Sequence, residues 1–221
     1  GDINIKYNSK INSPEDLENL GYEKIVVATG LQNPIQLNVQ NENLTIRGLD
    51  YLKSPKKYKL KNKNVAVIGG GATAVDCAVT AVKNRANRVE MITLETFYEM
   101  PLTSKERAEI IDNGIYVEGR TKVTEIIKTG KSISGIKLSK IKLKDGVKFN
   151  LKDLSDIPDT EITRSDFDEV IVSIGARGEF SKEKKTNIFY AGDFINGPTT
   201  VVEAVASGKN IAEILDAEIN N

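Results

Sequence analysis

Apolar and polar residues follow one another along the chain in patterns that predict strands and helices. A short apolar strand is predicted at Asn64–Ile68, followed by a helix over Thr73–Arg85 and a second strand over Arg88–Leu94. A further helix is expected to begin at Thr103 and to end at Asn113, which precedes a glycine. Strand, helix and strand in this order make a βαβ unit, so the pattern indicates a parallel sheet in an α/β fold.

Three later segments alternate apolar and polar residues with the period of two that half-buried strands have. They are Ile115–Glu118, Val123–Lys128 and Ser132–Leu143, with turns expected at Gly130 and at Asp145. Together they predict an antiparallel meander that follows the βαβ unit.

Two apolar runs that each end at a glycine, Ile25–Gly30 and Phe167–Gly175, are expected to be buried strands. The lysine-rich segment Tyr51–Asn64 contains a proline and suits a surface linker between two units. An amphipathic helix is expected over Thr199–Ala217, close to the last residue of the sequence. These features predict domain boundaries near residues 53/54 and 165/166.

Composition narrows the chemistry that these elements can carry. The 221 residues include 31 Lys and Arg against 31 Asp and Glu, and this zero net charge gives no case for binding nucleic acid or an anionic membrane. The sequence has no histidine, which excludes Ser-His-Asp catalysis and most zinc sites, and its one cysteine, Cys77, excludes a CxxC redox pair. We therefore expect a cytoplasmic protein with no metal site and no catalytic side chain, whose chemistry comes from a cofactor.

Three consecutive glycines stand where the first predicted strand must turn into the helix. The residues that fit the G-x-G-x-x-G/A pattern are Gly69, Gly70, Gly71, Ala72, Thr73 and Ala74. In this pattern the first glycine permits a tight turn, the second lets backbone approach a pyrophosphate, and the third small residue lets the helix pack closely on the strand. The N–H groups at the helix N-terminus then meet the anion. Two other interpretations stay open: a glycine-rich turn that binds nothing, and a loop that binds S-adenosylmethionine.

Longer motifs are similar to those of a known family. "VIGGGATAVDCA", "EMP" at Glu99–Pro101 and "YAGDFINGPTTVVEAVASGK" resemble flavoprotein oxidoreductases with two dinucleotide-binding domains, of the glutamate synthase small-subunit and dihydropyrimidine dehydrogenase type. The resemblance covers nearly the whole chain. It implies an α/β fold in which a Rossmann-type NAD(P)-binding domain with an antiparallel β-meander spans residues 54–165. Residues 1–53 and 166–221 would be two pieces of an incomplete FAD-binding domain.

The same resemblance assigns residues to the flavin and to the domain crossings. It implies that Asp193 hydrogen-bonds the FAD ribityl chain and that the next helix aims its N-terminus at the isoalloxazine ring. Gly30 and Gly175 would end the two strands where the chain crosses between domains. The residues implied in this way are Gly30, Gly175, Gly192, Asp193, Thr200 and Val201. Asp193 could instead be a solvated turn residue that caps the terminal helix.

For the parent protein, the resemblance implies hydride transfer from NAD(P)H to FAD and passage of electrons to a further domain or subunit. The alternative is a non-catalytic nucleotide-binding or assembly module. The chain departs from the family in having no strand–GxGxxG–helix segment before Ile25 and no cysteines for iron–sulfur clusters. It resembles the downstream portion of such a flavoprotein, so the upstream FAD-binding segment is an implied partner and this fragment alone is not expected to retain FAD.

The second predicted strand bears on the choice of nicotinamide cofactor. Leu94 and Glu95 fall where the glutamate synthase type tends to carry paired arginines. A carboxylate at the end of this strand selects a ribose 2′-OH, whereas arginine accepts a 2′-phosphate, so Glu95 predicts a preference for NADH over NADPH. Three other readings stay open: Thr93 rather than Glu95 faces the ribose, Glu95 is merely a solvated charge, or Lys105 or Arg107 binds a phosphate.

Overall fold

The computed structural model describes residues 3–182 and 185–219. The chain forms two compact units. Unit 1 combines the segment up to Asn33 with the segment from Ala176 onward, and unit 2 is the segment Pro34–Gly175 between them. The chain passes from one unit to the other through two short strands that pair with each other, β2 (Asn33–Pro34) and β12 (Ala176–Arg177).

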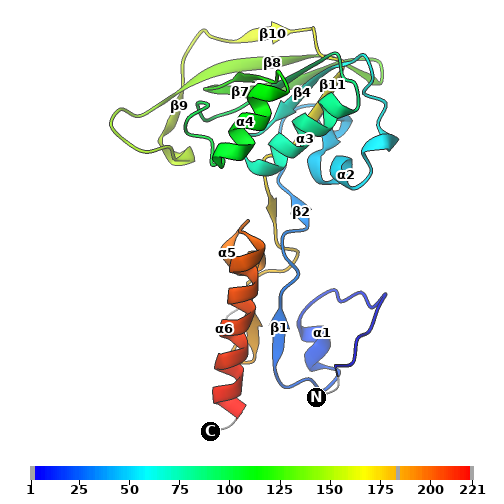
Figure 1. Ribbon diagram of the computed structural model, residues 1–221, viewed down its shortest axis with the longest axis vertical. Helices are drawn as coiled ribbons and strands as arrows, with labels where there is room; N and C mark the ends of the chain where they lie inside the picture. Colours follow the sequence, from blue (N-terminus) through cyan, green and yellow to red (C-terminus); the bar gives the residue numbers. More distant parts are fainter. Residues whose placement is uncertain (1–2, 183–184, 220–221) are drawn as a thin grey trace. The chain divides into compact units, whose positions relative to one another are not determined.

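A parallel sheet of five strands forms the middle of unit 2 (Figure 1). Its strands lie in the order β3 (Ile46–Arg47), β11 (Glu169–Val172), β4 (Asn64–Ile68), β5 (Arg88–Ile92) and β6 (Tyr116–Glu118). The register places Ile68 beside both Ile92 and Val172, so the carboxyl ends of the three central strands are level. Ligands of open α/β sheets bind at this edge.

Helices cover one face of this sheet and an antiparallel sheet covers the other. The helices are α2 (Gly48–Lys53), α3 (Ala72–Lys83) and α4 (Ser104–Asp112), and the antiparallel strands are β7 (Thr121–Thr129), β8 (Ser132–Leu143) and β10 (Ile162–Arg164). Along β4, Val65 and Val67 pack into the core beneath the helices, whereas Ala66 and Ile68 pack into the core shared with the antiparallel sheet. Because it is buried on both faces, β4 is apolar at every position after Asn64, as a central parallel strand should be.

The remaining elements of unit 2 are short. They are η1 (Glu42–Leu44), η2 (Pro55–Lys57), η3 (Leu151–Asp153) and β9 (Leu154–Asp156), which pairs with the end of β8. α4 begins as predicted, since Thr103 and Glu106 form a capping box that satisfies N–H groups of its first turn.

Unit 1 is built on a two-stranded parallel sheet. Its elements are α1 (Glu15–Glu18), β1 (Ile25–Val27), β13 (Ile188–Tyr190), α5 (Asp193–Asn196) and α6 (Val201–Ile219). A small apolar cluster joins β1 and β13 to Phe194 of α5. α6 has no buried residue. Among residues 3–182 and 185–219, no helix has both the length and the apolar character that a bilayer crossing requires.

One predicted strand pairing is wrong. Ile115–Glu118 was expected to start the antiparallel meander, but β6 pairs in parallel with β5. The reason is the crossover helix α4, which returns the chain to the amino end of the sheet before β6 begins, and such a connection joins parallel strands. The other two segments do pair antiparallel, as β7 and β8.

The lysine-rich segment 51–64 lies inside unit 2 and does not link the two units. Tyr51, in α2, and Leu60, which follows it, are both buried in the core beneath the helices. β3 and β11 also join the parallel sheet of unit 2, so the compact unit extends beyond residues 54–165 on both sides. The assignment of domains to cofactors stays a prediction.

Candidate functional site

The loop between β4 and α3 contains two glycines with close neighbours and one without. At Gly69, φ is +134° and a Cβ would lie 2.1 Å from the carbonyl oxygen of Ser173. At Gly70, a Cβ would lie 2.7 Å from Oε2 of Glu95. At Gly71, a Cβ would have no neighbour within 4 Å. The backbone at Gly71 is therefore open to a ligand, and no packing against residues 3–182 or 185–219 accounts for a glycine there.

The helix that follows the loop offers unpaired N–H groups. Gly71 is the N-cap of α3 and provides no side-chain cap, and the first turn of α3 has no acidic residue. Ala74 is fully buried at the third small position, where it lets the helix approach the strand. The uncapped first turn and the helix dipole together favour an anion beside Gly71.

Glu95 extends its carboxylate over this loop and reaches Gly70. The side chain is half-buried, and no residue in the described part of the chain donates a hydrogen bond to its carboxylate. Thr93 is buried and donates its hydroxyl to the backbone oxygen of Glu95 at 2.7 Å. The Glu95 carboxylate is therefore the accessible acceptor at the loop, whereas the Thr93 side chain is buried.

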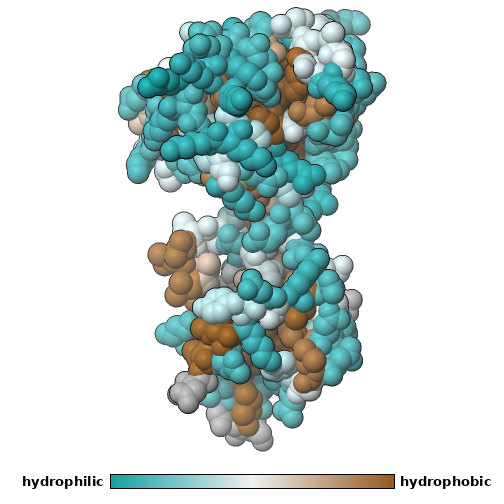
Figure 2. Space-filling view, turned by 90° about the vertical axis from the view of Figure 1, so that its right-hand side faces the viewer, coloured by the Kyte–Doolittle hydropathy of each residue, from teal (hydrophilic) through white to brown (hydrophobic). Residues whose placement is uncertain are grey.

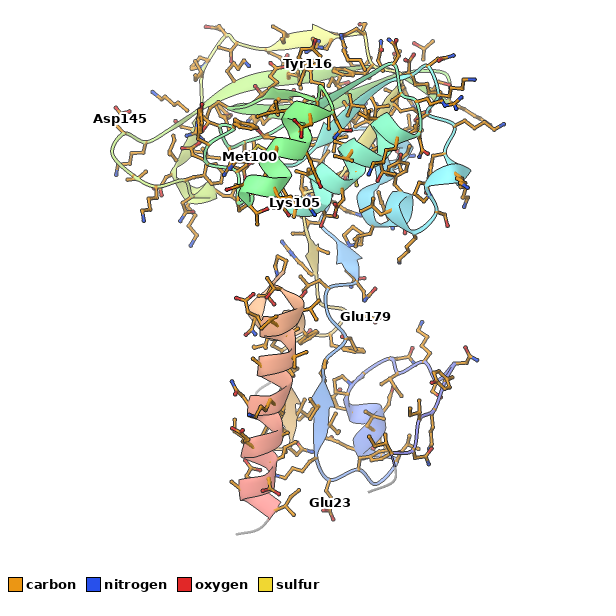
Figure 3. The ribbon with its side chains drawn as sticks, viewed as in Figure 1. Glu23, Met100, Lys105, Tyr116, Asp145 and Glu179 are labelled. Carbon is orange, nitrogen blue, oxygen red and sulfur yellow. The ribbon has the colours of Figure 1, made fainter. Side chains whose placement is uncertain are left out.

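The two cations proposed as alternative phosphate ligands have different surroundings. The guanidinium of Arg107 donates to the carbonyl oxygens of Phe97, Tyr98 and Met100, the last at 2.6 Å, so it is committed to the loop that follows β5. Lys105 is exposed in the first turn of α4 (Figure 3). Of the two, only Lys105 has a side chain that can turn to a ligand at no cost to the loop.

The residues predicted to meet FAD are in unit 1. Gly192 has φ of +63° and donates its N–H to Ser207 of α6 at 2.9 Å. Oδ1 of Asp193 accepts bonds from the N–H of Thr199 at 3.2 Å and from its hydroxyl at 2.6 Å. Asp193 thus fixes the turn that leads into α6, which agrees with its interpretation as a turn-capping residue and leaves Oδ2 for a ligand.

The first turn of α6 is capped from within. Thr200 and Glu203 exchange bonds, with the N–H of Thr200 donating to Glu203 at 2.8 Å and the N–H of Glu203 donating to Thr200 at 3.3 Å. The bond from the N–H of Thr200 lowers the pKa of the Glu203 carboxyl. Val201, which begins the helix, is 81% exposed. The α6 N-terminus is therefore ordered and open to solvent.

The two glycines predicted to lie where the chain crosses between domains are close in sequence to the boundaries of the units. Gly30 and Gly175 have φ of +68° and +103°, which explains glycine at both positions. Gly175 also accepts a bond from the N–H of Ile35 at 3.0 Å. Beside Gly30, Thr29 lines a hollow of unit 1 together with Lys10 and Val27. The predicted residues thus form one group at the glycine loop of unit 2 and one group in unit 1, while Gly175 is the last residue of unit 2.

This strand–loop–helix and the order of elements around it match a known family. The family model described as pyridine nucleotide-disulphide oxidoreductase matches residues 3–208. The chain belongs to the pyridine nucleotide-disulphide oxidoreductase family.

Two named proteins are similar in sequence to this chain. The chain is 26% identical to the NADP(+)-dependent formate dehydrogenase subunit beta of Moorella thermoacetica over 97% of this chain and 34% of the relative. It is 26% identical to the glutamate synthase [NADPH] small chain of Azospirillum brasilense, over 87% of this chain and 48% of the relative. The chain thus spans about a third to a half of these relatives' length.

Among solved structures, the thioredoxin reductase of T. acidophilum is similar in fold to this chain. The TM-score is 0.64 at 18% sequence identity, over 90% of this chain and 66% of that chain. The sequence prediction of an α/β fold with a Rossmann-type domain is confirmed.

The "disulphide" of the family name has no counterpart in these 221 residues, which contain one cysteine. Cys77 is fully buried in α3, and burial raises the pKa of its thiol to about 12. A thiol in that state is unreactive. In the described segments 3–182 and 185–219, no group of three or more His, Cys, Asp or Glu side chains could hold a metal ion.

Two residues at the loop could not be found from the sequence pattern. Ser173 makes Gly69 obligatory through its backbone oxygen, and Arg120 holds the segment that carries Glu95. Ser173 follows β11, and Arg120 lies between β6 and β7, so both are distant from the loop in sequence. Only the sheet topology shows that they meet the loop.

Proposed function

We propose that unit 2 binds a nicotinamide dinucleotide on the loop Gly69–Ala74 and that the parent protein passes hydride from it to a flavin. The open backbone at Gly71 carries this proposal. Gly69 is explained by the backbone of Ser173, but Gly71 has free space at the uncapped end of a 12-residue helix. A pyrophosphate fits that combination, because it needs close approach to backbone and donors from the helix N-terminus.

The flavin belongs to unit 1 in this proposal. Asp193 would take the ribityl chain through Oδ2, and the first turn of α6 would face the isoalloxazine ring. When bound, FAD would accept the hydride and pass electrons onward one or two at a time. The protein's own contribution is to bind and orient the two cofactors.

The partner that completes unit 1 is proposed to be an FAD-binding segment supplied by the longer protein. A parallel sheet is normally buried on both faces, yet Val26 of β1 is 44% exposed. Exposed apolar side chains of α6 are Val201, Val202, Val205, Ile214 and Ile219. Figure 2 shows hydrophobic surface on unit 1. Relatives about two to three times as long leave ample chain for such a segment. A further subunit or domain would then receive the electrons.

The 221-residue chain is expected to be colourless after purification and dialysis. The flavin surface that the adenosine-side βαβ unit would cover is not provided by these residues, so most of the binding energy for FAD is missing. Absorbance spectra and flavin released on denaturation measure the content directly. One flavin per chain after dialysis would contradict this expectation.

The cofactor choice is proposed to be NADH. The carboxylate of Glu95 beside Gly70 has no donor within the described chain and can accept from the 2′- and 3′-hydroxyls of an adenine ribose. A 2′-phosphate about 5 Å from this charge would be repelled by roughly 2–3 kcal/mol for each unit of its negative charge at an effective dielectric of 20–40.

Parallel calorimetric titrations should show tighter binding of NADH than of NADPH. Glu95→Gln keeps the shape of the side chain and removes its charge, so it should raise NADPH affinity by about tenfold or more and narrow the difference between the two affinities. NADPH binding at least as tightly as NADH in the unaltered chain would refute the preference. Measurements at low and moderate salt show how much of the affinity difference between NADH and NADPH is electrostatic, because salt screens the repulsion between charges.

A test for hydride transfer distinguishes this proposal from the alternative, a non-catalytic module. The chain joined to an upstream FAD-binding segment should show flavin absorbance that NADH bleaches. Stable flavin binding with no bleaching by either nicotinamide would favour a module that kept the fold and lost the reaction.

A further inference from the structure

Glu95 occupies its place over Gly70 because the backbone on both sides of it is held by one residue. Nη1 of Arg120 donates to the carbonyl oxygen of Leu94 at 3.0 Å. The backbone N–H of Arg120 lies 3.4 Å from the carbonyl oxygen of Glu95 itself. The peptide groups before and after Glu95 are thus both bonded to Arg120, which fixes the direction in which the Glu95 side chain leaves the chain.

Further hydrogen bonds, made by Arg120 and Glu99, hold the segment 94–99 in a turn. Nη2 of Arg120 donates to Oε1 of Glu99 at 2.7 Å, and Oε2 of Glu99 accepts from the N–H of Thr96 at 2.9 Å and from its hydroxyl at 2.7 Å. The bond from the Thr96 N–H and the neighbouring guanidinium lower the pKa of the Glu99 carboxyl. Glu99 is therefore ionised at neutral pH and bonds Arg120 as a charged pair.

The loop between β8 and β9 supports Arg120 from the other side. The guanidinium lies over the ring of Phe149, 5.6 Å from its centroid. Phe149 follows the tip of this loop, where Figure 3 labels Asp145. Arg120 is also one of the few non-glycine residues with positive φ, +51°, a conformation seldom adopted without a local reason. Its neighbour Gly119 packs against the carbonyl oxygen of Glu95 so closely that a Cβ would lie 2.7 Å from it.

We infer that Arg120 is a positioning residue that holds Glu95 over the glycine loop and so sets the discrimination between NADH and NADPH. This inference rests on the proposed nucleotide site. Arg120 touches no ligand in it and acts through the segment 94–99. A lysine could replace the charge but not the geometry, because its ammonium lacks the two separate nitrogens, Nη1 and Nη2, with which the planar guanidinium reaches Leu94 and Glu99.

The test is the ratio of NADPH to NADH dissociation constants, measured by calorimetry on the 221-residue chain. Arg120→Met should lower this ratio by about threefold or more, because a loosened Glu95 bonds the ribose less well and can move away from a 2′-phosphate. Arg120→Lys should fall in between. Lys137→Met is the matched control: it also removes one cation paired with carboxylates, Glu125 and Glu161, but on the antiparallel sheet, and should leave the ratio unchanged.

The double variant Glu95→Gln/Arg120→Met decides whether Arg120 acts through Glu95. If it does, adding Arg120→Met to Glu95→Gln changes the ratio no further. An unaltered ratio in Arg120→Met would mean that Arg120 only stabilises the fold, and a raised ratio would mean that it contacts the 2′-phosphate directly. Either result overturns the inference while leaving the nucleotide site in place. An unaltered chain that binds neither nucleotide overturns the proposed function, and the inference with it.

Discussion

Gly69→Ala is expected to lower the free energy of unfolding by about 3–5 kcal/mol, combining the strain of a positive φ with the overpacking of a Cβ. The atom in the way is the backbone oxygen of Ser173, 2.1 Å from the new Cβ. It cannot move freely, because the N–H of Ser173 donates to Ile68 at 2.8 Å as part of the sheet. Urea unfolding followed by circular dichroism gives the change.

Gly71→Ala is the matched control in the same loop. Its Cβ would meet nothing within 4 Å and its φ of −88° suits any residue, so its stability should stay within about 1 kcal/mol of the unaltered chain. Equal losses at the two positions would show that the steric account of the loop is wrong. If Gly69→Ala does not fold at all, the loss exceeds the stability of the unaltered chain, which is the same direction of change, and Gly71→Ala must still fold.

Gly71→Val should weaken nucleotide binding by tenfold to a hundredfold, about 1.4–2.8 kcal/mol, with little change in melting temperature. A branched side chain would occupy the open space at the start of α3, where we propose that the pyrophosphate lies. Calorimetric titration with NADH and a thermal melt of the same sample measure the two quantities together.

Gly208→Val in α6 controls for adding a valine at an open glycine. Among the described residues, no atom lies within 4 Å of a Cβ there, and Gly208 belongs to unit 1 whereas the loop belongs to unit 2. It should leave NADH affinity unchanged. If Gly71→Val binds NADH as tightly as the unaltered chain does, the loop is structural only and the proposed function loses the observation that carries it.

The parts of the fold that local sequence signals determine could be predicted. The strand Asn64–Ile68 is found exactly as its apolar run predicted, and α3 begins at Ala72, one residue before the expected start. Thr103 and Glu106 mark the start of α4 through a capping box. In each case the residues that decide the structure are neighbours in sequence.

The parts that depend on long-range pairing could not be predicted. The alternation in Ile115–Glu118 fits a strand in either kind of sheet, and only the crossover through α4 makes it parallel. The different roles of Gly69 and Gly71 likewise depend on Ser173, about a hundred residues away in the sequence. The sequence shows the pattern of glycines. It does not show which of these glycines the packing of the fold requires.

The hydrogen bonds that fix the start of the glycine loop affect the entropic cost of binding a ligand there. Its first residue, Gly69, donates its N–H to Ile92 at 3.0 Å, and the oxygen of Ile68 just before it accepts from Ser173. The loop therefore begins on a strand that is bonded on both edges and buried on both faces. The loop has already lost its conformational entropy on folding. A nucleotide would therefore bind a preorganised loop, and binding would not carry the entropic cost of ordering it.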